Sequence, residues 1–69
     1  MEMKSVSSTN LAAVGYDEAN QTLRVEFKNG GIYDYYDVPQ SEYENLMQAS
    51  SHGQYLAQNI KGRYRYARV

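Results

Sequence analysis

The residues of this chain best suited to chemistry lie near its C-terminal end, between positions 61 and 68. This stretch reads K-G-R-Y-R-Y-A-R, with four cations and two tyrosines in eight residues. Cationic side chains contact phosphates, and aromatic rings stack on unpaired bases. The composition is that of a binding site for RNA or single-stranded nucleic acid, and the candidate residues are Lys61, Arg63, Tyr64, Arg65, Tyr66 and Arg68.

The charge of the chain is unevenly distributed, although its net value is only −1. Residues 1–60 hold eight acidic and three basic side chains, whereas residues 61–69 hold four basic side chains and no acid. This asymmetry favours a polyanionic partner. The commoner arrangement for such a segment stays open beside it. In that arrangement the two tyrosines pack onto the fold, and the arginines are solvated or pair with Glu42 or Glu44.

Other reactive side chains do not assemble into a catalytic or metal site in the sequence. His52 is the single histidine, and the chain has no cysteine to share a metal with it. Ser50 and Ser51 precede His52, but helix capping explains these serines better than a nucleophilic pair. The carboxylates fall in predicted turns and on exposed helix faces, where they stay solvated. We therefore expect no enzyme activity, no metal and no cofactor.

The elements that must position the C-terminal segment begin with three predicted strands. Residues 22–28 alternate apolar and polar side chains, as a strand with one buried face does. Asn29-Gly30-Gly31 supplies a tight turn, and a second strand runs from Ile32 to Val38, before Pro39. Residues 11–16 form an earlier strand, with Val14 and Tyr16 expected on one face and Leu11 and Ala13 on the other. The three strands form an antiparallel up-down-up meander.

The register of the hairpin around Asn29 has two possible forms. A two-residue turn places Asp34 on the face of Val25, whereas a three-residue loop with a bulge places Tyr33 and Tyr35 there. Burying an unpaired carboxylate is costly, so we favour the bulged form with Asp34 in water. Tyr33 and Tyr35 are then expected to pack in the core, and Tyr36 to lie on the surface.

Two short helices are predicted after the sheet. The first begins at Pro39 or at the Ser41–Glu44 capping box, and its apolar stripe holds Tyr43, Leu46 and Met47. The second is capped by Ser50 or Ser51, continues to about Ile60 and ends at Gly62. Its inner face would hold Tyr55, Leu56 and Ile60. The remaining residues, 63–69, alternate cations and apolar groups as an extended segment would.

These elements define one α+β domain over residues 1–69: a three-stranded antiparallel meander, two short helices and an extended C-terminal segment. Residues 1–8 are polar and are expected to be flexible. No stretch approaches the roughly 18–20 apolar residues of a membrane span, and the N-terminal residues lack the apolar run of a signal peptide. The sequence therefore predicts a cytoplasmic protein without membrane contact.

Several segments together resemble the KTSC domain, a small module found at the C-terminus of some lysyl-tRNA synthetases and in stand-alone bacterial proteins. They are Ser8–Tyr16, Leu23–Phe27, Gly30-Gly31, Tyr33-Asp34-Tyr35, Val38-Pro39 and Ile60–Tyr66. The Tyr-x-Tyr element before Val-Pro is the family's hallmark. The resemblance covers nearly the whole chain and implies a stand-alone copy. It carries over no catalytic residues, and the synthetase context suggests RNA binding.

The sequence thus predicts a small non-catalytic module that binds RNA or single-stranded nucleic acid through its basic, aromatic C-terminal segment. An alternative of a different class is a protein-interaction or self-associating module. It rests on a small sheet with unprotected edges in a domain that buries little surface by itself.

Overall fold

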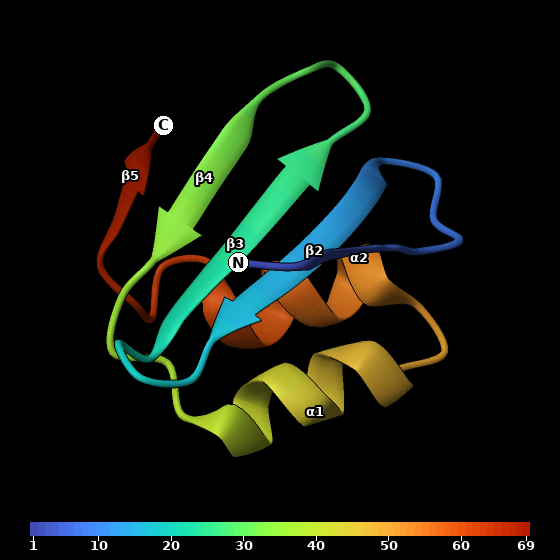
Figure 1. Ribbon diagram of the computed structural model, residues 1–69. Coiled ribbons are helices and arrows are strands. Elements are labelled where there is room, and N and C mark those ends of the chain that lie inside the picture. Colours follow the sequence, from blue (N-terminus) through green and yellow to red (C-terminus); the bar gives the residue numbers. More distant parts are fainter.

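A five-stranded antiparallel sheet, covered on one face by helices, forms the computed structural model of residues 1–69 (Figure 1). The strands follow one another across the sheet in chain order, and each neighbouring pair is antiparallel. This confirms the α+β class and the antiparallel meander, but the prediction of three strands was wrong. The strands are β1 (Met3–Ser5), β2 (Leu11–Asp17), β3 (Thr22–Phe27), β4 (Ile32–Tyr35) and β5 (Tyr66–Arg68).

The two unpredicted strands are the edges of the sheet. β1 pairs with β2 through Met3 and Gly15, so the segment expected to be flexible includes a strand. β5 is extended, as predicted, and it also pairs with β4. Both strands are only three residues long, too short to show the alternation that marks β3.

The hairpin between β3 and β4 has the bulged register that the sequence favoured. Leu23 lies opposite Tyr35, and Val25 lies opposite Tyr33. Gly30 has a φ of +97°, which a residue with a side chain rarely adopts. The Asn29 side chain closes the loop, since its Oδ1 accepts a hydrogen bond of 3.0 Å from the Gly31 amide. The two tyrosines therefore face the helices together with Leu23 and Val25.

Asp34 lies on the opposite face, as expected, but it is not in water. Its side chain is 10% exposed, and Arg24, directly across the strand pair, binds it with both nitrogens of one edge of the guanidinium. The Arg24 Nε–Asp34 Oδ1 distance is 2.8 Å and the Nη2–Oδ2 distance is 3.0 Å. The prediction of solvation was wrong because a cross-strand cation neutralises the carboxylate.

A bulge in β2 also changes which side chains face inward. Leu11 pairs with Phe27 and Val14 with Val25, and the register shifts between Leu11 and Ala13. Leu11 and Val14 are therefore both fully buried in the core, and the prediction that they lie on opposite faces was wrong. The extra residue resets the alternation of the strand.

The helical layer consists of α1 (Gln40–Gln48), α2 (His52–Tyr55) and a π-helical continuation, η1 (Leu56–Ile60). Pro39 immediately precedes α1, and the proposed capping box at Ser41 makes no capping hydrogen bond. Ser51 caps α2 as predicted, because its Oγ accepts a hydrogen bond from the Gln54 amide. The wide turn of η1 is closed by the Lys61 amide, which donates to the Leu56 carbonyl. Gly62 follows with a φ of +78°, which ends the helix.

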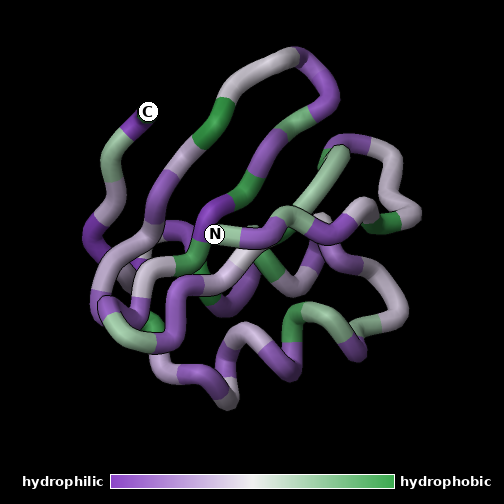
Figure 2. The backbone as a smooth tube through the Cα atoms, in the orientation of Figure 1, coloured by the Kyte–Doolittle hydropathy of each residue, from purple (hydrophilic) through white to green (hydrophobic).

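The core lies between the sheet and the helices. β3 alternates hydrophobic and hydrophilic residues along its length (Figure 2). Neither helix has the length and hydrophobicity needed to cross a membrane. The buried core consists of Leu11, Val14, Leu23, Val25, Tyr35, Val38, Leu46, Leu56 and Ile60.

Candidate nucleic-acid interface

The six predicted site residues reach three different places on the surface. Lys61 and Tyr66 line a pocket on the helical face of the sheet, and Arg68 lies next to it, against the ring of Tyr33. Arg63 and Tyr64 lie near α1, where Tyr64 contacts Glu42. Arg65 lies beside Asp37 and Tyr36. The cations of this segment are therefore spread around the end of the sheet.

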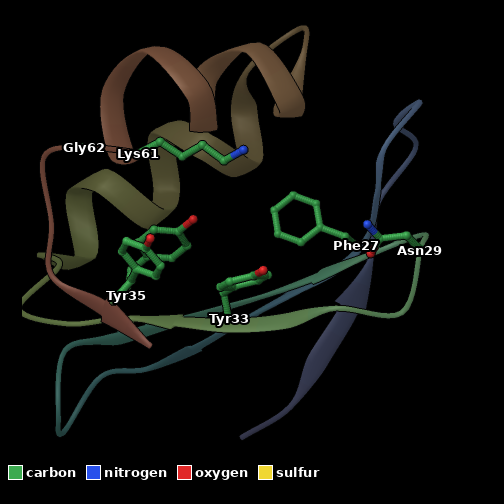
Figure 3. Close-up of a pocket in the computed structure, with 7 residues that line it drawn as sticks. Phe27, Asn29, Tyr33, Tyr35, Lys61 and Gly62 are labelled. Carbon is green, nitrogen blue, oxygen red and sulfur yellow. The ribbon is translucent and has the colours of Figure 1, made fainter. Parts of the chain in front are cut away.

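The pocket has a volume of about 500 Å³ and lies between the sheet and the end of η1. Figure 3 shows Tyr33 and Tyr35 rising from β4, while Lys61 extends from the end of the helical layer toward Phe27. Tyr66 lines the same side of the pocket because β5 places it directly opposite Tyr35. The lining residues are Phe27, Asn29, Tyr33, Tyr35, Lys61, Gly62 and Tyr66.

The aromatic rings of the pocket touch one another at steep angles. Phe27 and Tyr33 form an edge-to-face pair with ring centroids 5.6 Å apart. Tyr66 is tilted by 53° to Tyr33 and by 36° to Tyr35, at centroid distances of 6.0 and 5.7 Å. Four rings from three strands thus form one continuous aromatic surface, of which Tyr66 is the exposed member, at 58%.

Two cations flank this aromatic surface. The Nζ atom of Lys61 lies 5.4 Å from the Phe27 ring centroid, and the Cζ atom of Arg68 lies 5.9 Å from that of Tyr33. Arg68 shares the face of Tyr33 because the two residues are partners across β4 and β5. Neither cation forms a salt bridge, and no acidic side chain lines the pocket. The pocket is therefore open to an anionic group.

The hydroxyls of Tyr33, Tyr35 and Tyr66 make no hydrogen bond within the chain. By contrast, the Tyr16 hydroxyl donates to the Val38 carbonyl, under the helical layer. Tyr35 is only 3% exposed. Its burial, followed by the proximity of Tyr66 and Tyr33, raises the pKa of its phenol. Tyr35 therefore keeps its proton at neutral pH, as a donor that points into the pocket.

Glu42 on α1 holds two tyrosines in a separate cluster. Its Oε2 accepts a hydrogen bond of 2.8 Å from the Tyr64 hydroxyl, and its Oε1 accepts one from Tyr55. The bond to Glu42 is the main cause that raises the pKa of Tyr55, whereas burial is the main cause for Tyr64. Tyr64 thus ties the C-terminal segment to the helices, and the Cζ atom of Arg63 lies 5.9 Å from its ring centroid.

Arg65 is held only weakly by its neighbours. Its Nη2 atom is 3.6 Å from Asp37 Oδ2, and both side chains are mostly exposed, so this ion pair is weak. Its Cζ atom lies 5.2 Å from the centroid of Tyr36, which is half-buried instead of fully on the surface. Arg65 can therefore exchange its present contacts for a phosphate.

A second hollow, of about 390 Å³, has an entirely polar lining of Ser7, Ser8, Thr9, Ser50, Ser51 and His52. His52 Nδ1 is 2.8 Å from the Leu46 carbonyl, so this nitrogen carries a proton and donates it. Ser51 is engaged in capping α2, and no hydrogen bond joins either serine to His52. No group of three metal-binding side chains occurs in the structure.

The sequence prediction missed the half of the pocket that comes from β3 and β4. Phe27 and Asn29 were treated only as parts of a hairpin, and for Tyr33 core packing was preferred to base stacking. The available signal was the alternation of cations and rings after Gly62, which is also the pattern of a strand. Pairing that strand with β4 would have placed Tyr66 and Arg68 beside Tyr35 and Tyr33.

The fold and the pocket define a small α+β domain with one aromatic, cationic surface. The sequence matches the KTSC domain over residues 7–64, and the chain belongs to this family. The crystal structure of a KTSC domain protein from Yersinia pestis superimposes with a TM-score of 0.96 at 32% identity. That match covers 99% of this chain and 96% of the Yersinia chain.

Relatives of two kinds share this sequence. A protein of Tsukamurella paurometabola is 38% identical over 63 residues, which is 91% of this chain and 94% of that protein. A lysine–tRNA ligase of a Nostoc species is 41% identical over 59 residues, or 86% of this chain. The matched part is only 10% of the ligase. The domain therefore occurs both in small proteins and inside much larger ligases.

Proposed function

We propose that this KTSC domain is a non-catalytic module that binds RNA or single-stranded nucleic acid through the surface around β5. The observation that carries the proposal is the exposed ring of Tyr66, which lies on the same face of β5 as Arg68 and lines a pocket with Lys61. Exposed aromatic rings among free cations are the means by which proteins hold single strands. Arg63 and Arg65 add two exposed cations nearby in the chain.

Two further observations support this proposal. Of the four cations between Lys61 and Arg68, only Arg65 forms an ion pair, and that pair is weak, so the local charge of the segment is not neutralised. Similar domains also occur inside lysine–tRNA ligases, whose name specifies tRNA as a substrate. A module that adds contacts to RNA suits such a protein.

The cations of the segment should account for the affinity and for its dependence on salt. We expect tRNA and single-stranded oligonucleotides to bind with a salt slope of about −3, if all four cations contact phosphates of a single strand. The combined variant Arg63→Ser/Arg65→Ser/Arg68→Ser should bind weakly, with a slope of about −0.7 from Lys61. Fluorescence anisotropy at several salt concentrations measures both quantities.

Lys4→Ser is the matched control, because Lys4 lies on β1 at the other edge of the sheet. It should leave the affinity and the slope unchanged. Wild-type binding weaker than about millimolar at low salt would overturn the proposal. So would equal affinities of the wild type and the combined arginine variant, once thermal unfolding has shown that both are folded.

The alternative function is self-association or protein binding through the open edge of β5. The exposed side chains of Tyr66 and Val69, both 58% accessible, favour it because they flank that edge. A three-residue edge offers few hydrogen bonds to another strand, so we prefer the first proposal. We expect a monomer in sedimentation velocity at high concentration. A dimer that Tyr66→Ser abolishes would instead favour the alternative.

A further inference from the structure

We propose that the pocket of Phe27, Tyr33, Tyr35 and Tyr66 takes one unstacked nucleobase of the bound strand. In this arrangement Lys61 and Arg68 contact the adjoining phosphates. The inference rests on the proposed function and adds a specific ligand class for its pocket. Three independent features lead to it: the ring geometry, the unpaired hydroxyls and the placement of the cations.

The pocket rings are not stacked on one another, and Tyr66 offers an exposed ring for stacking. Tyr66 meets Tyr33 and Tyr35 at tilted angles, and Phe27 meets Tyr33 edge-on at 85°. A different arrangement occurs away from the pocket, where Tyr16 and Tyr43 are stacked at 11° with centroids 5.0 Å apart. In that pair each ring stacks on the face of the other, whereas no pocket ring is stacked on another. The volume of about 500 Å³ lies within the range of small-molecule sites, roughly 300–1,000 Å³.

The polar groups of the pocket also lack partners. Tyr35 is almost completely buried as a residue, but its hydroxyl oxygen is not a buried atom and makes no hydrogen bond within the chain. The hydroxyl is therefore free to donate to a polar edge of a ligand in the pocket. Asn29 uses its Oδ1 to close the hairpin, which leaves its amide nitrogen free to donate. A nucleobase supplies both the flat face for the rings and the polar edge for these groups.

The cations determine which kind of flat ligand fits best. Lys61 lies across the pocket from β4 (Figure 3). Arg68, on the edge strand β5, lies beside the ring of Tyr33. Two unpaired cations at the rim of an aromatic pocket favour a ring that carries an anionic group. A base within a strand has such a phosphate on each side. The pocket is therefore suited to a nucleotide unit, and less to a neutral aromatic compound.

The test is a coupling measurement between one protein ring and one base. The probes are a short single-stranded oligonucleotide and the same oligonucleotide with its central base removed, so that the backbone charge stays constant. For the wild type, we expect removal of the base to weaken binding by about 5- to 150-fold. Tyr66→Leu should lose a similar factor with the intact probe and should no longer distinguish the two probes.

Two further variants make the test specific. Tyr36→Leu removes a ring that contacts Arg65 outside the pocket, and it should preserve the full discrimination between the probes. Tyr35→Phe keeps the buried ring and removes only the hydroxyl. It should keep the fold and weaken binding of the intact probe by several-fold.

The outcomes separate this inference from the proposed function. If the wild type binds both probes equally, with the expected salt slope, the pocket inference is overturned and the nucleic-acid proposal stands. If neither probe binds, both the pocket inference and the proposed function are overturned. A purine mononucleotide that binds as tightly as the intact oligonucleotide, and loses affinity in Tyr66→Leu, supports the nucleotide pocket. That result would overturn the idea that the domain holds a strand.

Discussion

Arg24→Ala is expected to lower the free energy of unfolding by about 3 kcal/mol, more than Asp34→Ala at the other end of the same ion pair. The asymmetry follows from exposure. The Asp34 side chain is 10% exposed and receives both of its hydrogen bonds from Arg24, so without Arg24 its carboxylate is left nearly buried and unpaired. The Arg24 side chain is 37% exposed and can turn to water when Asp34 is lost. We expect Asp34→Ala to cost about 1 kcal/mol.

Urea denaturation of the two single variants measures this difference directly. The control is the double variant Arg24→Thr/Asp34→Thr, which removes both charges and retains residues suited to strands. It should be more stable than Arg24→Ala. Equal losses in the two single variants would show that Asp34 is not effectively desolvated in the protein.

Glu42→Ala is the second substitution with a large expected effect, a loss of about 2–3 kcal/mol. Glu42 accepts hydrogen bonds from Tyr55 on α2 and from Tyr64 in the C-terminal segment, so one side chain joins both of these parts of the chain to α1. Hydrogen bonds to a charged acceptor are worth more than neutral ones. In a domain of this size, such a loss is a large part of the total stability.

Thermal and urea unfolding of three variants test the role of Glu42. Glu42→Gln keeps one acceptor oxygen and should lose less than Glu42→Ala. Glu44→Ala is the matched control, because Glu44 is an exposed residue of the same helix. It should change stability by no more than about 0.5 kcal/mol. A similar small change in Glu42→Ala would contradict the proposed role of Glu42.

The central part of the fold follows from local patterns in the sequence. The alternation of Leu23, Val25 and Phe27 predicted β3, and the cost of burying Asp34 correctly favoured the bulged register. The same register also places Arg24 opposite Asp34, a pairing that the cost of burial alone does not predict. The edge strands and the bulge in β2 could not be predicted in this way. The edge strands form only against strands that are already in place, and each has only three residues, too few to show the alternation of a strand.

Only half of the candidate site could be predicted from the sequence. Composition alone identified Lys61, Tyr66 and Arg68, because cations and rings alternate there in the sequence. Their partners Tyr33 and Tyr35 lie about thirty residues earlier, and only the pairing of β5 with β4 brings them together. Buried and pocket-lining roles are also not exclusive. Tyr35 belongs to the core and still directs its hydroxyl to the pocket.

The position of β5 also has a consequence for how the domain opens. β5 is held by one neighbour only, and both helices separate it in the chain from that neighbour. Closing so long a loop costs conformational entropy, and edge segments with few contacts detach at a low free-energy cost. The amides of β5 should therefore exchange with solvent long before those of β3. The wall that carries Tyr66 and Arg68 should then open before the centre of the sheet does, and a nucleotide bound as proposed would slow that exchange.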